Sequence, residues 1–120
     1  MSIFGQLANL FSRAGREDNL LQQGMAHASA NEPEKAIGIY DSLVRSKSAT
    51  VRSRALFNRA LAHSLMKQDA KAIADLEQVV AMPDAPENVL TAARTQLIRV
   101  RNRGERVRSR DTSVRNRTQQ

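Results

Sequence analysis

Residues 20–44 read LLQQGMAHASANEPEKAIGIYDSLV, and residues 56–80 read LFNRALAHSLMKQDAKAIADLEQVV. The second stretch follows the first after 36 residues without a gap, so that Gly24 matches Ala60 and His27 matches His63. A fixed period of about 20 to 50 residues is typical of proteins in which similar units stack on one another. The chain is therefore expected to be a repeat protein with two copies of one unit.

Each copy predicts two amphipathic helices joined by a tight turn. The first turn, at residues 31–33, ends in a proline, which suits the first turn of a new helix. The second turn lies at Gln68 and Asp69, and Asp69 can cap the helix that follows it. The apolar and small positions of the first copy recur at the spacing of one helix face: Leu20, Gly24, His27 and Ala28 before the turn, then Ala36, Ile37, Tyr40, Leu43 and Val44.

Both copies resemble the tetratricopeptide repeat over about residues 17–83. That family places a bulky apolar residue and then a small one in its first helix, and a small residue, an aliphatic residue and a bulky residue in its second. The resemblance implies an all-α solenoid of antiparallel helix pairs. The period of 36 exceeds the usual 34, which implies a longer link at residues 46–49, and a histidine replaces a common aromatic. The matching residues are Leu20, Gly24, Ala36, Ile37 and Tyr40, and then Leu56, Ala60, Ala72, Ile73 and Leu76.

The two repeats are expected at residues 17–48 and 53–84, followed by a capping helix at residues 87–102, within one domain from 15 to 102. Thr50 is a candidate cap for the helix expected from Val51 to about Lys67. Residues 1–14 predict a separate amphipathic helix, which Gly15 is expected to end. Its apolar face, Ile3, Phe4, Leu7, Leu10 and Phe11, is expected to fold back on the repeats; a membrane interface, a partner protein or a second copy of the chain remain alternatives.

The net charge of +7 is concentrated at the end of the chain. Residues 1–93 carry ten basic and ten acidic residues, whereas residues 94–120 carry nine arginines and two acids. Few apolar residues occur after position 102, so residues 103–120 are expected to form a disordered basic tail. The alternative function is that this tail binds a polyanion, either nucleic acid or an anionic membrane, with the repeats as an adaptor; a tail that only keeps the protein soluble is also open. The candidate polyanion-binding residues are Arg99, Arg101, Arg103, Arg106, Arg108, Arg110, Arg115 and Arg117.

The family resemblance also implies a concave groove lined by the first helix of each repeat. When the repeats are aligned with the family, the positions that would line this groove form a second apolar stripe. This stripe is separate from the one that packs within each repeat. We expect this groove to bind an apolar peptide or helix of another protein, because Leu21 and Met25 replace the polar groups that would hold a carboxylate. The predicted groove residues are Leu21, Met25 and Ala28 in the first repeat, and Phe57, Asn58, Leu61 and Leu65 in the second.

Composition favours a binding protein over an enzyme. There is no cysteine, and no phosphate-binding glycine loop or nucleophile elbow, so no catalytic residue, cofactor or small-molecule substrate is predicted. His27 and His63 are expected to pack between the helices of their own repeats and not to bind a metal. No apolar run is long enough to span a membrane and no secretory signal is evident, so the cytoplasm is the default location.

Overall fold

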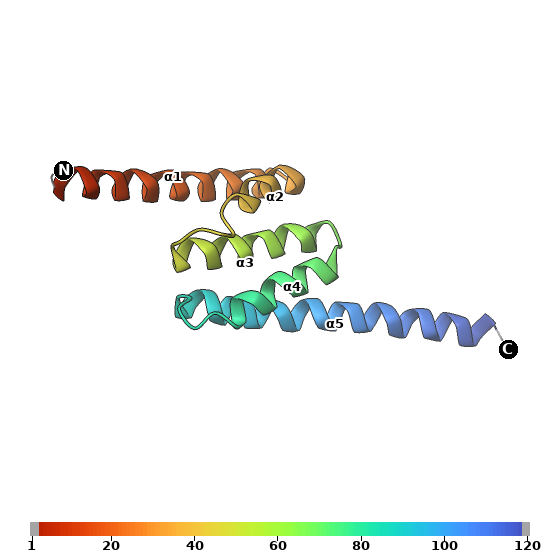
Figure 1. Ribbon diagram of the computed structural model, residues 1–120. Coiled ribbons are helices and arrows are strands. Elements are labelled where there is room, and N and C mark those ends of the chain that lie inside the picture. The colour runs from red at the N-terminus through yellow and green to blue at the C-terminus, as the bar shows by residue number, and fades with distance from the viewer. Residues whose placement is uncertain (1–2, 119–120) are drawn as a thin grey trace.

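The computed structural model describes the backbone of residues 3–118 and the side chains of residues 15–117. This part of the chain is all-α (Figure 1). Helices α1 and α2 form one antiparallel pair, α3 and α4 form a second, and α5 packs along α4 and α3. The bounds are α1 Ile3–Ser29, α2 Pro33–Asp41, α3 Ala49–Leu65, α4 Asp69–Val80 and α5 Glu87–Thr118.

The turns inside the two pairs are built alike. Asn31 and Lys67, 36 residues apart, both adopt the left-handed conformation, with φ of 61° and 59°. The amide that follows each of them donates to the carbonyl of the equivalent histidine at 2.9 Å, from Glu32 to His27 and from Gln68 to His63. Because both turns have the same backbone conformation and hydrogen bond at equivalent positions, the two helix pairs are copies of one structural unit.

The helix starts differ in part from the sequence prediction. The backbone N–H of Val51 donates to the hydroxyl of Ser48 at 3.3 Å, so Ser48 caps α3 and the prediction of Thr50 was wrong. Pro33 takes the first turn of α2, as predicted. Asp69 begins α4 without capping it, because Gln68 holds the cap position and makes no side-chain cap bond. Its carboxylate instead binds Arg103 of α5.

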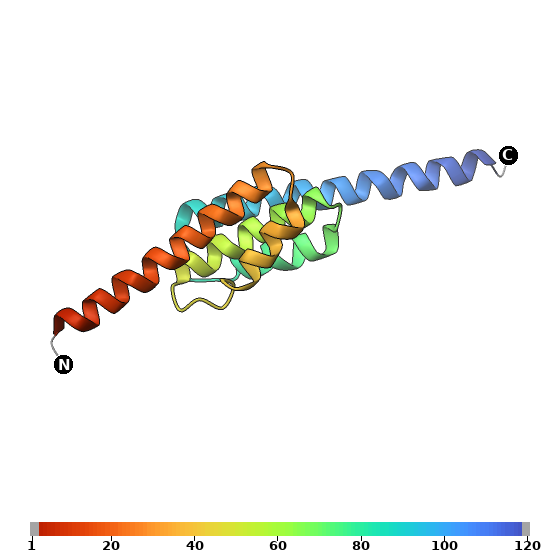
Figure 2. The same ribbon diagram turned by 90° about the horizontal axis from the view of Figure 1, so that it is seen from above.

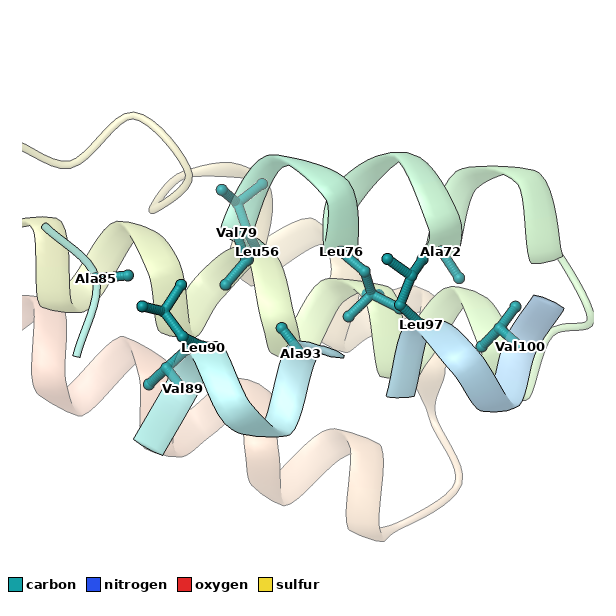
Figure 3. Close-up of a cluster of buried hydrophobic side chains, with 11 residues drawn as sticks. Leu56, Ala72, Leu76, Val79, Ala85, Val89, Leu90, Ala93, Leu97 and Val100 are labelled. Atoms are coloured by element: carbon teal, nitrogen blue, oxygen red, sulfur yellow. The ribbon is translucent and has the colours of Figure 1, made fainter. Parts of the chain in front are cut away.

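Among the described side chains, the core consists of two clusters, one on each side of α3. The first joins α1, α2 and the start of α3; its buried residues are Leu21, Ala36, Tyr40, Leu43, Val51 and Ala55. The second joins α3, α4 and α5 (Figure 3), and its buried residues are Leu56, Ala60, Ala72, Leu76, Val79, Ala85, Val89, Leu90, Ala93, Leu97 and Val100. The first part of α5 therefore completes the core that the second repeat alone leaves open.

Gly15 does not end a helix, and the prediction of a separate N-terminal helix that folds back on the repeats was wrong. α1 runs without interruption from Ile3 to Ser29, and its N-terminal part extends beyond the other helices (Figure 2). One glycine costs only about 1 kcal/mol inside a helix relative to alanine, which the rest of a 27-residue helix can offset. The side chains of Ile3, Phe4, Leu7, Leu10 and Phe11 lie outside the described residues.

Removing residues 1–15 is expected to leave the melting temperature nearly unchanged. The shortened chain keeps Glu17, which accepts a hydrogen bond from the Ser46 hydroxyl, and all residues of both core clusters. We expect a shift within about 4 °C, the change that about 1 kcal/mol produces in a domain of this size. Thermal unfolding followed by circular dichroism measures it. A fall of 10 °C or more would instead mean that this segment is packed on the repeats in solution.

The prediction of a disordered tail was also wrong, because α5 continues as one helix to Thr118 and projects beyond the other helices (Figure 1). Composition was a poor guide here. The apolar content of residues 103–120 is too small for an independent core, but these residues extend a helix that is already packed. Elongation avoids the cost of nucleation, and arginine is a good helix former.

Candidate protein-binding groove

An open pocket of about 370 Å³ lies between α1 and α3. Leu21 forms part of it and is buried, whereas Met25, one turn further along α1, is 50% exposed. Asn58 faces them from α3. The structure therefore brings together three of the residues predicted to line a groove. A flexible methionine beside a buried leucine can accept apolar side chains of different shapes.

The other predicted groove residues lie elsewhere or are part of the core. Phe57 is half-buried and packs against the cluster of α3, α4 and α5, so its assignment to a stripe not needed for packing was wrong. Ala28 packs against the first cluster. Leu61 is half-buried, and Leu65 is 58% exposed at the end of α3. The cluster against which Phe57 packs is formed by residues of α3, α4 and α5 together.

Sequence reasoning missed three polar residues of this pocket. Asp18 and Gln22 contribute to it from α1, and Arg54 contributes from α3. Helical spacing could have predicted two of them, because residues three or four apart lie on the same helix face. Asp18 precedes Leu21 by three residues, and Arg54 precedes Asn58 by four. The groove predicted from the sequence contained one polar residue, Asn58, and none of these three. The pocket carries one carboxylate and one guanidinium, so a ligand must satisfy charge as well as bury apolar surface.

Arg59 on α3 is the best-connected charged residue of the two repeats. It donates two hydrogen bonds of 2.8 Å to the carboxylate of Asp75, and a third of 3.0 Å to Asp41. The Asp75 side chain is only 7% exposed, whereas that of Asp41 is 56% exposed. The hydrogen bonds to Asp75 raise the pKa of Arg59 above its ordinary value. This network joins α2, α3 and α4, and we assign it a structural role.

The two histidines hold the equivalent turns of the two repeats. His27 Nδ1 lies 3.3 Å from Glu32 Oε1, and His63 Nδ1 lies 2.8 Å from Gln68 Oε1. Glu32 and Gln68 occupy the same position, just before the second helix of each repeat. Hydrogen bonds to Lys35 and to His27 hold the pKa of Glu32 below its ordinary value. No cluster of three or more potential metal ligands occurs among the described side chains.

Comparison with known proteins identifies the repeat. The family model described as Tetratricopeptide repeat matches residues 18–46 and 54–84, which together make up half of the chain. The chain belongs to the tetratricopeptide repeat family. No curated protein and no solved structure gave a significant match.

Tetratricopeptide repeats are protein–protein interaction modules and are generally not catalytic. In this tetratricopeptide chain, the pocket lies between the first helices of the two matched repeats, α1 and α3. Within residues 3–118, no helix is both long enough and apolar enough to cross a membrane.

The arginines predicted to bind a polyanion fall into two groups in the tetratricopeptide chain. Arg101 pairs with Glu77 at 2.6 Å, and Arg103 binds Asp69 and the hydroxyl of Ser64, so both hold α5 against the second repeat. The side chains of Arg99, Arg106, Arg108, Arg110, Arg115 and Arg117 are exposed. The second group marks α5 as a separate charged surface, remote from the pocket between α1 and α3.

Proposed function

We propose that this chain is a non-catalytic adaptor that binds a peptide or helix of another protein in the groove between α1 and α3. The observation that carries the proposal is the pocket in which Leu21, Met25 and Asn58 meet. Met25 remains half-exposed although it lies next to the buried Leu21. An apolar side chain that enters beside Met25 would bury its own surface and the exposed surface of Met25. This burial stabilises the complex by roughly 25 cal/mol per Å² of apolar area.

Two charged groups at this pocket support a defined orientation of the ligand. Asp18 on α1 can accept hydrogen bonds from a ligand, and Arg54 on α3 can bind a carboxylate or a carbonyl oxygen. We therefore expect ligands that combine one buried aliphatic or aromatic residue with polar or charged neighbours. A small number of polar groups around an apolar centre is the usual arrangement of a recognition site.

The proposal predicts that Met25→Glu weakens the binding of peptides selected by the wild-type chain. Selection from a random peptide library displayed on phage, followed by fluorescence anisotropy, supplies the ligands and their affinities. We expect Met25→Glu to weaken these peptides at least tenfold, about 1.4 kcal/mol, because it places a charge where the anchor residue is buried. The matched control is Ile98→Glu, which alters an exposed apolar residue of α5, 60% exposed, outside the pocket. Equal losses in both variants, or no enriched peptide, would contradict the groove assignment.

A further inference from the structure

The face of α5 that packs on the second repeat has a simple composition. Leu90, Ala93, Leu97 and Val100 are buried, and they alternate at spacings of three and four residues. Figure 3 shows Leu97 beside Ala72 and Leu76 of α4. Alternation of three and four residues is the spacing of a helix seam that packs against another helix. We call these four residues, together with Gly104 and Val107 at the same spacing, the α5 seam.

Arginines beside the α5 seam bind carboxylates of α4. Arg101 donates to Glu77 at 2.6 Å, and Arg103 binds Asp69 as well as the Ser64 hydroxyl. These arginines stand next to Val100 along the chain, at the two flanks of the seam. The contact between α4 and α5 therefore has two parts: an apolar centre, and arginines on α5 that face acidic residues on its partner helix.

The same arrangement recurs seven residues further along α5. Val107 follows Val100, Arg108 follows Arg101, and Arg110 follows Arg103. A shift of seven residues returns to nearly the same helix face, with a drift of only about 20°. Val107 is 53% exposed, and Arg108 and Arg110 are exposed as well. α4 begins at Asp69, which binds Arg103, so α4 does not extend along the part of α5 that carries Val107, Arg108 and Arg110.

A pocket lies at the point where α4 ceases to cover the α5 seam. The pocket, of about 370 Å³, is lined by Lys67 and Asp69 from the turn and start of α4, and by Arg103, Gly104 and Val107 of α5. Gly104 occupies a seam position, since it follows Val100 by four residues and precedes Val107 by three. A residue without a side chain at this position leaves room for an apolar side chain of an incoming helix.

We propose that the projecting part of α5 binds an acidic amphipathic helix of another protein, which continues along the α5 seam where α4 ends. The α5 seam continues the contact between α4 and α5, and the arginines at its flanks complement an acidic partner. A partner with a narrow apolar stripe flanked by glutamates or aspartates would repeat what α4 offers through Asp69 and Glu77. The surface is separate from the groove between α1 and α3, so this inference does not depend on the proposed function.

A second copy of the chain fits this surface less well. Pairing two α5 helices would bring arginines against arginines, because both flanks of the seam carry them at Arg101, Arg103, Arg108 and Arg110. Like charges at these flanking positions disfavour helix pairing. The N-terminal part of α1 offers no carboxylate either, since the first acidic residue of the chain is Glu17.

The orientation follows from α4, which runs antiparallel to α5 (Figure 1). An antiparallel partner would place its C-terminal end next to Lys67 and the start of α4. The positive N-terminal end of the α4 dipole and the lysine would both favour the negative end of the incoming helix.

A designed helical peptide tests the proposal with the full chain. The probe has three heptads, with leucine and alanine along one stripe and glutamate at both flanks, and carries a fluorophore for anisotropy. Repulsion between its glutamates keeps it from pairing with itself. A scrambled peptide of identical composition removes the stripe and keeps the charge. A single-stranded RNA and anionic lipid vesicles serve as the polyanion probes. We expect the striped peptide to bind at least tenfold more tightly than the scrambled one.

Two pairs of substitutions with equal change of charge locate the contact. Arg108→Glu with Arg110→Glu should weaken the striped peptide at least tenfold, and a peptide with lysine flanks should then bind this variant better than it binds wild type. Arg99→Glu with Arg106→Glu changes exposed arginines further from the seam and should weaken binding no more than about threefold. Val107→Ser, which leaves charge unchanged, should weaken the striped peptide at least fivefold. Equal binding of striped and scrambled peptides, or equal losses in the two charge variants, would overturn the proposal and favour a polyanion on this helix.

Discussion

Replacing Arg59 by leucine is expected to lower the free energy of unfolding by about 3 kcal/mol. The substitution leaves the carboxylate of Asp75, 7% exposed, without the two 2.8 Å hydrogen bonds that Arg59 donates. A buried charge that loses its partner retains its desolvation cost and loses the attraction that offset it. Stabilities of small domains are about 5–15 kcal/mol, so this loss is a large fraction of the total. Urea unfolding followed by circular dichroism measures it.

Two further variants separate burial of charge from the number of ion pairs. Asp41→Asn removes the other carboxylate that Arg59 binds, but its side chain is 56% exposed, so the expected loss is below about 1 kcal/mol. The double variant Arg59→Leu with Asp75→Leu should recover most of the stability, because it leaves no unpaired buried charge. If Asp41→Asn is as destabilising as Arg59→Leu, the explanation through the burial of Asp75 is refuted.

Replacing Gly24 by alanine is expected to cost about 2 kcal/mol, although alanine is the better helix former. The new Cβ would overlap Cε1 of the Tyr40 ring and lie 2.9 Å from its Cζ. Tyr40 is 1% exposed and so has little space into which its ring can move. Overpacking of this kind costs about 1–3 kcal/mol or more and outweighs the gain of roughly 1 kcal/mol in helix propensity.

The second repeat supplies the matched control for Gly24. There Ala60 and Leu76 stand at the positions of Gly24 and Tyr40, and both are buried in the cluster of α3, α4 and α5. The double variant Gly24→Ala with Tyr40→Leu reproduces this pair, and we expect it to be more stable than Gly24→Ala alone. Thermal unfolding of the two single variants and the double variant gives the coupling energy. Purely additive effects would show that the glycine is not required by the tyrosine ring.

The burial pattern explains why these two substitutions should exceed the others in effect. Arg59 and Gly24 each make contacts inside a repeat, where the helices lie close together. Met25, Arg108 and Arg110 point outward from helices that are stable without them, so their substitution should alter binding and not folding. This difference allows stability and binding measurements to distinguish structural residues from partner contacts.

The sequence alone determined the repeat, its phase and its helix pairs. Local spacing carries this information, because the small residues Gly24, Ala36, Ala60 and Ala72 mark where helices approach closely and turn residues mark where they reverse. Helical spacing also places Asp18 and Arg54 beside the predicted groove residues, although the sequence prediction of an apolar ligand did not include them. The equivalence of the turns at Asn31 and Lys67 likewise follows from the period of 36.

Tertiary packing decided which side chains are buried, which arginines form an interface and whether the end of the chain is helical. Phe57 is half-buried against the core cluster that residues of α3, α4 and α5 form together. Arg101 and Arg103 belong to an interface because Glu77 and Asp69 of α4 lie opposite them. The arginine-rich end of the chain is helical because it extends a helix whose first part is anchored on the repeats, so that only elongation remains. Composition measures how much apolar surface a segment has, whereas helix formation at residues 103–118 depends on the packed helix that precedes them.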